Sequence, residues 1–376
     1  MWRALAILAT AGCYGPSVHA GSPCSANEPC PTGLVCSPAS QTCELTAAAG
    51  DGGVDDGHPD VPPDVQLGAF RYRRRLTIKN GSTTPLPEGF AIRVKLGSTL
   101  ASLVAAGKVN ADYSDLRVIG DVTGERDRVV DPASGPAPPA ITFALAHPLD
   151  AGATTLDYAL YYGDPGAGPA PANGAAVFTI YDDFTAGLAT FWATNDGPAT
   201  SAGQLILRAG HTDAIATTAA TDKLPITSAV ELVARVPVPT SEPTVQPDGT
   251  FYYWFGYQTT GSFTPSDPWI LWIARGKSEV GPEQKSPVGC ETGCEPTTLT
   301  QNTSPHFFAI ERDPTQTRFT MDTSATIAQS VTNSEDYAVM VRNFMATSDL
   351  QVDYVRARAR VAPDPVAVLG SEESLP

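Results

Sequence analysis

The stretch from Thr154 to Trp192 constrains the fold of this chain most, because it joins two β-rich segments. Between residues 156 and 162, leucine and tyrosine alternate with other residues in the period-2 pattern of a half-buried strand. Glycine, proline and alanine then dominate residues 163–174, a composition typical of a connector. A second β-like pattern runs from Val177 to Phe184, so the sequence predicts two β-domains in tandem.

The composition favours a β-rich chain and excludes one class of partner. The 376 residues suffice for two or three domains, and 33 glycines with 34 prolines are typical of many turns. The net charge of −16 and the lack of a basic patch argue against nucleic acid, whose phosphates require clustered cations. An acidic surface mainly favours solubility.

The N-terminus has the features of a bacterial lipoprotein signal. A short positive start precedes an apolar run over residues 4–11, which is too short to span a bilayer. The segment from Thr10 to Cys13 resembles a lipobox, which implies a signal peptide over residues 1–12 and lipid modification of Cys13. Ordinary cleavage after Ala20 is the alternative. Lipidation would also explain the odd total of seven cysteines.

The next four cysteines predict a small disulfide-held segment over residues 13–45. This segment has almost no apolar content, so it cannot fold around a hydrophobic core. Three pairings are open, and the lack of a Cys-x-x-Cys pair argues against zinc. A further disulfide is expected in an insertion over residues 276–303. The cysteines concerned are Cys24, Cys30, Cys36 and Cys43, and then Cys290 and Cys294.

Residues 46–68 are rich in aspartate, glycine and proline and are predicted to form a disordered linker. Their aspartates resemble a calcium loop only superficially, since no glutamate occupies the twelfth position of any register. We therefore expect a stalk that holds the β-domains away from a membrane.

Short alternating runs separated by turn residues predict an antiparallel β-sandwich over residues 69–166. One short helix is expected at residues 100–106. The predicted strands cover residues 71–79, 90–96, 115–118, 141–145 and 156–162.

Three separate motifs stand out in this segment, and their residues are Arg75, Ile78, Asn80, Asp115, Leu116, Arg117, Tyr161, Tyr162, Gly163, Asp164 and Pro165. Together they resemble a bacterial family known as domain of unknown function 2341. The resemblance implies an extracellular β-sandwich of cell-surface proteins, and it implies no established activity. By spacing alone, Asp115 and Arg117 share one strand face and are expected to form a structural ion pair.

A second sandwich is predicted over residues 177–362, followed by a C-terminal tail at residues 363–376. Its opening Tyr-Asp-Asp-Phe, its later tryptophan and its closing strand resemble a concanavalin A-like or laminin G-like jelly roll. The whole chain is therefore expected to be all-β. The predicted strands cover residues 177–184, 204–208, 228–236, 251–258, 269–275, 306–312, 318–321, 337–343 and 350–361.

Motifs for catalysis are missing from the sequence. Jelly-roll glycosidases place alternate carboxylates on one strand as Glu-x-Asp-x-x-Glu, and no such stretch occurs. Glu311 and Asp313 flank Arg312 without a third acid, and the five histidines show no metal-ligand spacing. We therefore predict that the chain is not an enzyme. A cryptic glycoside hydrolase is the third possibility, after a glycan-binding role and a structural or adhesive role.

An aromatic platform for sugar rings is the favoured binding site, although plain core packing is the competing interpretation. Tyr252 and Trp254 alternate with other aromatics, so they share one strand face, and Trp272 lies on the next strand. The resemblance to jelly rolls also implies a possible calcium ion at Asp183 and Asp353. The alternative pairs the acidic residues 182 and 183 with the arginines at 356 and 358 across neighbouring strands.

Together these features predict a lipid-anchored extracellular protein of the bacterial cell envelope, either an outer-membrane lipoprotein or a secreted protein. Its expected role is non-catalytic binding of a glycan or another polymer. A purely structural or adhesive surface protein is the alternative. The expected partners are a membrane, through the lipid anchor, and a polysaccharide or surface protein, with no nucleic acid.

Overall fold

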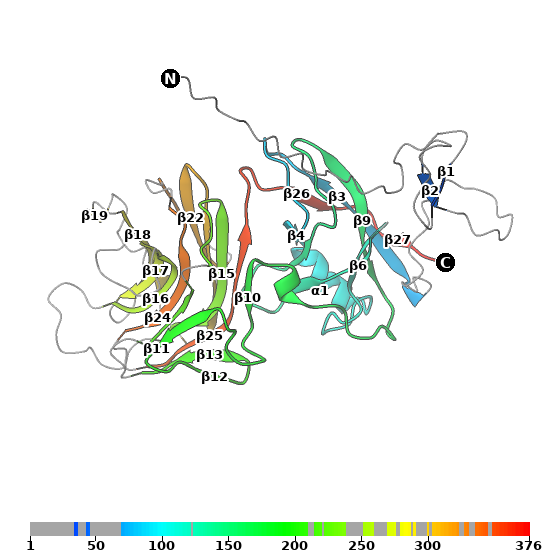
Figure 1. Cartoon of the computed structure of the whole chain (residues 1–376). Coiled ribbons are helices and arrows are strands. Elements are labelled where there is room, and N and C mark those ends of the chain that lie inside the picture. Colours follow the sequence, from blue (N-terminus) through cyan, green and yellow to red (C-terminus); the bar gives the residue numbers. More distant parts are fainter. Residues whose placement is uncertain are drawn as a thin grey trace, which may run out of the picture. The chain divides into compact units, whose positions relative to one another are not determined.

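The structure of the chain is a computed structural model, and it divides into two compact units, residues 1–58 and 59–376 (Figure 1). In the first unit, β1 (Leu34–Cys36) pairs antiparallel with β2 (Cys43–Leu45), which places Cys36 opposite Cys43. The other predicted lipid and disulfide cysteines, Cys13, Cys24, Cys30 and Cys294, lie outside the described residues. The structure describes residues 34–36, 43–45, 69–121, 123–209, 214–219, 222–237, 251–258, 269–275, 279–286, 289–290, 299–300, 303–322, 327–330, 335–344 and 348–376.

The first sandwich forms because its strands alternate between a buried face and an outer face. Leu76 and Ile78 of β3 are fully buried, and the helix α1 (Ser98–Ala105) adds Leu100 and Leu103 to the same core. One six-stranded sheet packs with a three-stranded sheet of order β4-β8-β7. The strands are β3 (Tyr72–Lys79), β4 (Ala91–Lys95), β5 (Arg117–Gly120), β6 (Gly124–Arg126), β7 (Arg128–Asp131), β8 (Ala140–Ala144) and β9 (Thr154–Tyr162).

The C-terminus returns to complete this first sandwich, where the sequence suggested a tail. β26 (Val366–Leu369) and β27 (Glu373–Ser374) both pair antiparallel with β3, and Figure 1 shows β26 beside it. Leu369 and Ala367 pack against the first core. The amide of Leu375 donates to the carbonyl of Arg71 at 2.8 Å. The first sandwich is therefore built from both ends of unit 59–376.

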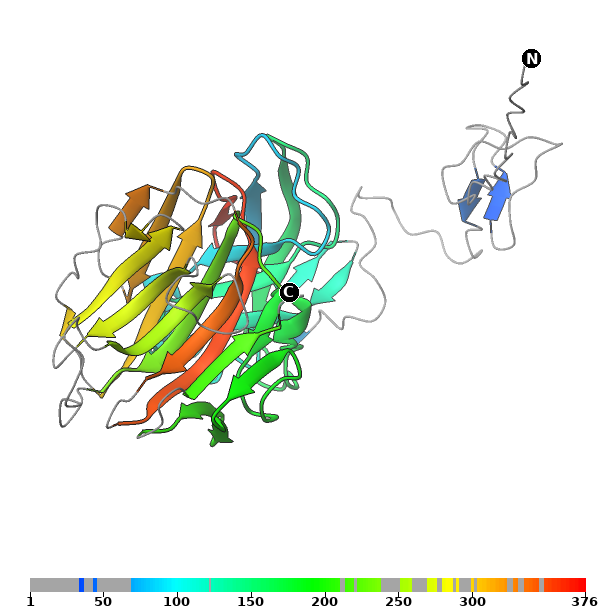
Figure 2. The same cartoon turned by 60° about the vertical axis from the view of Figure 1, so that its left-hand side comes forward.

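Two larger sheets form the second sandwich (Figure 2). The first has the order β12-β13-β25-β15-β21-β22-β23 with β10 beside β25, and the second has the order β11-β14-β24-β16-β17-β18-β19 with β20 beside β18. A short 3-10 helix, η2 (Gly174–Ala176), precedes them. The strands of the first sheet are β10 (Ile180–Asp182), β12 (Ala199–Ser201), β13 (Gln204–Leu207), β15 (Ser228–Arg235), β21 (Pro305–Arg312), β22 (Gln316–Met321), β23 (Ile327–Ser330) and β25 (Leu350–Ala359). Those of the second are β11 (Trp192–Asn195), β14 (Ala214–Thr218), β16 (Phe251–Gln258), β17 (Trp269–Arg275), β18 (Glu279–Ser286), β19 (Gly289–Cys290), β20 (Leu299–Thr300) and β24 (Ala338–Asn343).

The predicted all-β fold class is confirmed by these sheets and by their antiparallel pairing. The insertion at residues 276–303, whose sequence looks disordered, contains β18, β19 and β20. The expected opening strand at 177–184 is shorter than predicted. Only Ile180 to Asp182 pair, since the strand ends where Phe184 adopts a positive φ of 57°.

Motif residues of the first sandwich stabilise loops in the structure. The buried Asn80 amide donates to three carbonyls, those of Thr84, Leu149 and Asp150, at 2.9 to 3.3 Å. Gly163 has a φ of 87°, and a Cβ there would lie 2.7 Å from the ring of Tyr72. Glycine is therefore required at this position, for backbone conformation and for space.

Candidate functional site

The outer face of the sheet around β15 and β21 carries polar side chains, because alternate residues point away from the core. Phe308 and Ile310 of β21 pack in the core, so Ala309 and Glu311 point outward between them. The register places Glu231 of β15 between Ala309 on one side and Arg356 of β25 on the other. One face of the second sandwich thus presents a row of acidic, basic and small side chains.

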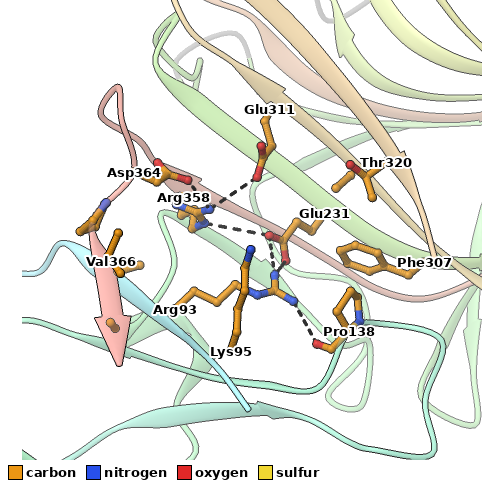
Figure 3. A pocket seen from close by; sticks show the side chains of 14 residues that line it. Arg93, Lys95, Pro138, Glu231, Phe307, Glu311, Thr320, Arg358, Asp364 and Val366 are labelled. Carbon is orange, nitrogen blue, oxygen red and sulfur yellow. Dashed lines mark hydrogen bonds and ion pairs between the residues drawn. The ribbon is translucent and has the colours of Figure 1, made fainter. Parts of the chain in front are cut away.

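A groove lies between this face and β4 of the first sandwich (Figure 3). β4 contributes Ala91, Arg93 and Lys95, which alternate with the buried Ile92 and Val94. The cavity has a volume of about 500 Å³, within the range of small-molecule sites. Alanines on opposite walls keep it open, because each brings only a methyl group. The remaining lining residues are Pro138, Glu231, Phe307, Ala309, Glu311, Thr320, Arg358, Asp364, Pro365, Val366 and Ala367.

Two carboxylates and two arginines form a buried ion-pair network at the floor of this groove. Glu231 accepts from Arg93 at 2.7 Å and from Arg356 at 2.6 Å, and it is 3% exposed. Asp131 of β7 accepts from Arg93 at 3.0 Å and from Arg356 at 2.8 Å. Both arginines therefore bridge carboxylates of the two sandwiches, and their charges balance those of the acids.

The network determines the protonation of Glu231. Burial alone would raise the pKa of Glu231. The guanidinium groups of Arg93, Arg356 and Arg358 outweigh that effect and hold the pKa of this carboxyl well below its ordinary value. Glu231 is therefore ionised at neutral pH and cannot act there as a proton donor.

Stability should consequently depend on pH in the acid range. A depressed folded-state pKa means that the contribution of Glu231 is fully present above its unfolded value of 4.5 and is lost as the pH falls below it. Glu231→Gln removes the titrating group. Between pH 5 and pH 2, we expect the free energy of unfolding to fall more steeply in the parent than in the variant, by about 2 kcal/mol or more in urea titrations. Equal slopes would contradict the network.

A second ionic group lies at the rim. Arg358 lies 3.8 Å from Glu311, 4.0 Å from Glu231 and 3.3 Å from Asp364, and only the last of these contacts is a hydrogen bond. Its Nε is buried and has no hydrogen-bond partner among the described residues. Arg360 lies behind it and donates to Asp364 at 3.2 Å. The Nε of Arg358 thus has donor capacity that no described residue uses.

Lys95 differs from the other cations of the groove. It is exposed, and in Figure 3 its side chain extends from β4 toward the space between Glu231 and Arg358. Within the described part of the chain, its ammonium group has no hydrogen bond or ion pair. The groove therefore contains one cation without a counter-charge.

The tryptophans expected in a platform are both buried. Trp272 is 1% exposed, packs edge-to-face on Phe308 and donates from Nε1 to the carbonyl of Ala309 at 3.3 Å. Trp254 is 7% exposed and stacks against Phe344, with the guanidinium of Arg342 over its ring. The competing interpretation, plain core packing, is therefore correct for Trp272. The side chain of Tyr252 lies outside the described residues.

The two aspartates expected near calcium have protein partners instead. Asp183 accepts from the backbone and hydroxyl of Thr185 at 3.1 and 2.7 Å. Asp353 accepts from Arg235 and Gln204, both at 2.5 Å. Among the residues that the structure describes, no three histidines, cysteines or acids gather as a metal site.

The acidic motif that opens the second sandwich also has a structural function. Asp182 accepts from the Trp192 indole at 2.8 Å and from the amides of Phe184 and Ala189, both at 2.9 Å. The suggested pairing of residues 182 and 183 with the arginines of β25 is wrong, because those arginines bind Glu231, Asp131, Glu311 and Asp364.

Two further predicted pairs have different partners. Arg117 pairs with Glu125 at 2.5 Å, while Asp115 accepts from the amides of Asn110 and Gly163 at 2.8 and 3.3 Å, so the expected Asp115–Arg117 ion pair is not the one formed. Asp313 caps a turn by accepting from Thr315 and Gln316. Glu311 instead lines the groove, and the two acids serve separate sites.

Sequence reasoning missed most of the groove, including Arg93, Lys95, Asp131 and Glu231. A signal was present, since a charged residue interrupts an otherwise apolar strand at Ile92-Arg93-Val94 and at Val230-Glu231-Leu232. Period-2 alternation predicts that these side chains point away from the core. It does not predict that a second sandwich covers them, because that depends on contacts distant in sequence.

No protein-family model matches the chain, and no curated protein matches it. Solved structures do match. An endo-acting O-glycanase of the human gut microbiota is 12% identical over 48% of this chain and 99% of its own, with a TM-score of 0.36. The Flavobacterium sp. UMI-01 laminarinase is 13% identical over 48% and 99%, with a TM-score of 0.37. The Emp46p carbohydrate recognition domain is 10% identical over 45% and 88%, with a TM-score of 0.35.

This comparison corrects the expectation that the chain is not an enzyme. Glycoside hydrolases are among the similar structures, including the Flavobacterium laminarinase and an endo-1,3-β-glucanase from Thermotoga petrophila RKU-1. The expectation rested on the missing Glu-x-Asp-x-x-Glu stretch, and it is overturned. At these identities the likeness concerns the fold alone.

Proposed function

We propose that this chain is an extracellular surface protein that binds a glycan or a related polymer in the groove between its two sandwiches. The observation that carries the proposal is the cavity of about 500 Å³, lined by charged, polar and small side chains from both sandwiches. Ligand sites occur preferentially between domains, where side chains from separate elements converge. Such a cavity has room for a sugar unit.

The lining suits a hydroxyl-rich ligand. Carboxylates accept hydrogen bonds only, guanidinium and ammonium groups donate only, and a sugar hydroxyl can do both. Glu311 and Asp364 lie on the rim with side chains 27% and 30% exposed, and Oδ1 of Asp364 is buried without a hydrogen-bond partner among the described residues. Arg358 supplies the buried donor. The ion pairs of Glu311 and Asp364 with Arg358 and Arg360 restrain these side chains, which reduces the entropy lost on binding.

A glycan array with the purified chain tests the proposal. Thr320 lines the groove on β22 and is partly exposed, so Thr320→Phe should fill the cavity without disturbing the core. Thr77→Phe places the same ring at an exposed position on β3. We expect binding by the parent and by Thr77→Phe, and at least a tenfold loss with Thr320→Phe.

Binding unaffected by Thr320→Phe would contradict the groove as the site. If the parent protein bound no glycan on the array, the structural or adhesive alternative would be favoured. Release of reducing ends should be measured in the same incubations, because the similar structures include glycanases.

We also propose that Cys13 is lipid-modified and attaches the protein to the bacterial envelope, on the strength of the sequence Thr10 to Cys13. No helix in the described part of the chain is long and apolar enough to cross a membrane. Cys13→Ser should move the protein from the detergent phase to the aqueous phase in a phase-partition experiment. Equal partition of parent and variant would contradict the anchor.

A further inference from the structure

We infer that the groove selects a sugar unit with a single negative charge, whose carboxylate binds between Lys95 and Arg358. This inference rests on the proposed function and specifies the chemical class of the ligand. It follows from the charges of the groove, from the unused donor of Arg358 and from the direction of Lys95.

The charges around the groove do not balance. Every arginine has a carboxylate within 4.0 Å, and Lys95 has none among the residues that the structure describes. Four arginines and four carboxylates pair with one another in and around the lining, and Lys95 adds one positive charge; Arg356, Arg360 and Asp131 belong to these pairs but do not line the cavity themselves. The cations are Arg93, Lys95, Arg356, Arg358 and Arg360, and the anions are Asp131, Glu231, Glu311 and Asp364.

Arg358 supplies the second observation. Its side chain is 7% exposed and lines the cavity, yet its Nε has no hydrogen bond. Its contacts with Glu311 and Glu231, at 3.8 and 4.0 Å, are too long for hydrogen bonds. The Nε atom itself is buried, so an anion that enters the cavity would bind through the part of the guanidinium group that lines the cavity.

Lys95 and Arg358 lie on opposite walls, one on β4 and one on β25, and Figure 3 shows the lysine pointing toward the arginine side of the cavity. Like charges approach one another only at a cost, which an anion between them removes. Glu311 and Asp364 flank the same space and would repel a second negative charge. The site therefore fits a monoanion and disfavours a dianion such as a phosphate monoester.

A neutral sugar fits the cavity less well. It would desolvate the Lys95 ammonium group without supplying a counter-charge, and unpaired buried charge is expensive. A carboxylate on the sugar provides two acceptor oxygens, one for the ammonium and one for the guanidinium. A sulfate ester offers the same charge, so the experiment includes both sources.

Calorimetric titration of the full chain with oligogalacturonate tests the inference. Its methyl ester has the same backbone without charge, and a sulfated neutral oligosaccharide supplies the other monoanion. We expect the acid to bind at least tenfold tighter than the ester. Lys95→Gln should weaken acid binding about tenfold and leave ester binding unchanged. Lys79→Gln, at an exposed position of β3 outside the groove lining, is the matched control and should change neither.

Two results would overturn the inference. Equal affinity for acid and ester would show that no charge is recognised. Equal affinity of parent and Lys95→Gln for the acid would show that Lys95 does not bind the carboxylate. After either result, glycan binding that Thr320→Phe abolishes would still support the proposed function. If the chain bound none of the glycans, both this inference and the proposed function would be wrong. If only the sulfated ligand bound, and its binding depended on Lys95, the preference for a monoanion would be confirmed, but the recognised group would be a sulfate ester and not a carboxylate.

Discussion

Glu231→Gln is expected to destabilise the protein by about 3–5 kcal/mol, the range measured when one partner of a buried ion pair is removed. Glu231 is 3% exposed and accepts from Arg93 and Arg356 at 2.7 and 2.6 Å. Glutamine keeps the shape and loses the charge, which leaves the buried Arg356 and the half-buried Arg93 to share Asp131. Urea denaturation followed by tryptophan fluorescence measures the change.

Glu311→Gln is the matched control. It lies on the same outer face, but its carboxylate is 27% exposed and its contacts with arginines are 3.7 and 3.8 Å long. Exposed pairs of this kind contribute about 0–1 kcal/mol. Similar losses in both variants, or a loss below about 1 kcal/mol for Glu231→Gln, would show that the network does not join the sandwiches.

Truncation after Ala362 is expected to destabilise the first sandwich by more than about 4 kcal/mol. It removes β26 and β27, together with the hydrogen bonds to β3 and the core contacts of Leu369 and Ala367. It also removes Asp364, the carboxylate paired with Arg358 and Arg360. Limited proteolysis should then cut the first sandwich while the second survives.

A shorter truncation after Gly370 separates the two strands. It keeps β26 and Asp364. It loses β27 with the Arg73–Glu373 pair, which is 2.7 Å long and partly exposed. It also loses Glu372, which pairs with Lys108 and accepts from Tyr162, and the hydrogen bond from Leu375 to Arg71. We expect a smaller loss, of about 1–2 kcal/mol. Unchanged protease resistance after the longer truncation would show that the C-terminus is dispensable to the fold.

Local patterns were sufficient to predict most of the strands. Alternation in 350–361 and 228–236 predicted β25 and β15, because each has one face in a core. β26 was missed because Val-Ala-Val-Leu is a short apolar run without the alternation of a half-buried strand. In the structure Val366 and Val368 are 56% and 54% exposed. Its partner β3 lies nearly three hundred residues away, and no local signal reports such a pairing.

The candidate site was the harder prediction. Aromatic richness suggested Trp254 and Trp272, but aromatics also fill sandwich cores, and both are buried. The groove instead consists of isolated charged residues on strands of two sandwiches, among them Arg93 and Glu231. Each could be assigned to an outer face from the sequence. Their convergence depends on how the two sandwiches pack, which period-2 patterns do not encode.

Hydrogen–deuterium exchange of the full chain with and without oligogalacturonate tests the central claim most directly. The groove predicts ligand-dependent protection in β4, in β21 and β22, and in residues 364–367, with less protection in Lys95→Gln. Protection of β16 and β17 around Trp254, with the groove strands unchanged, would contradict the account and place the binding face on the opposite sheet of the second sandwich.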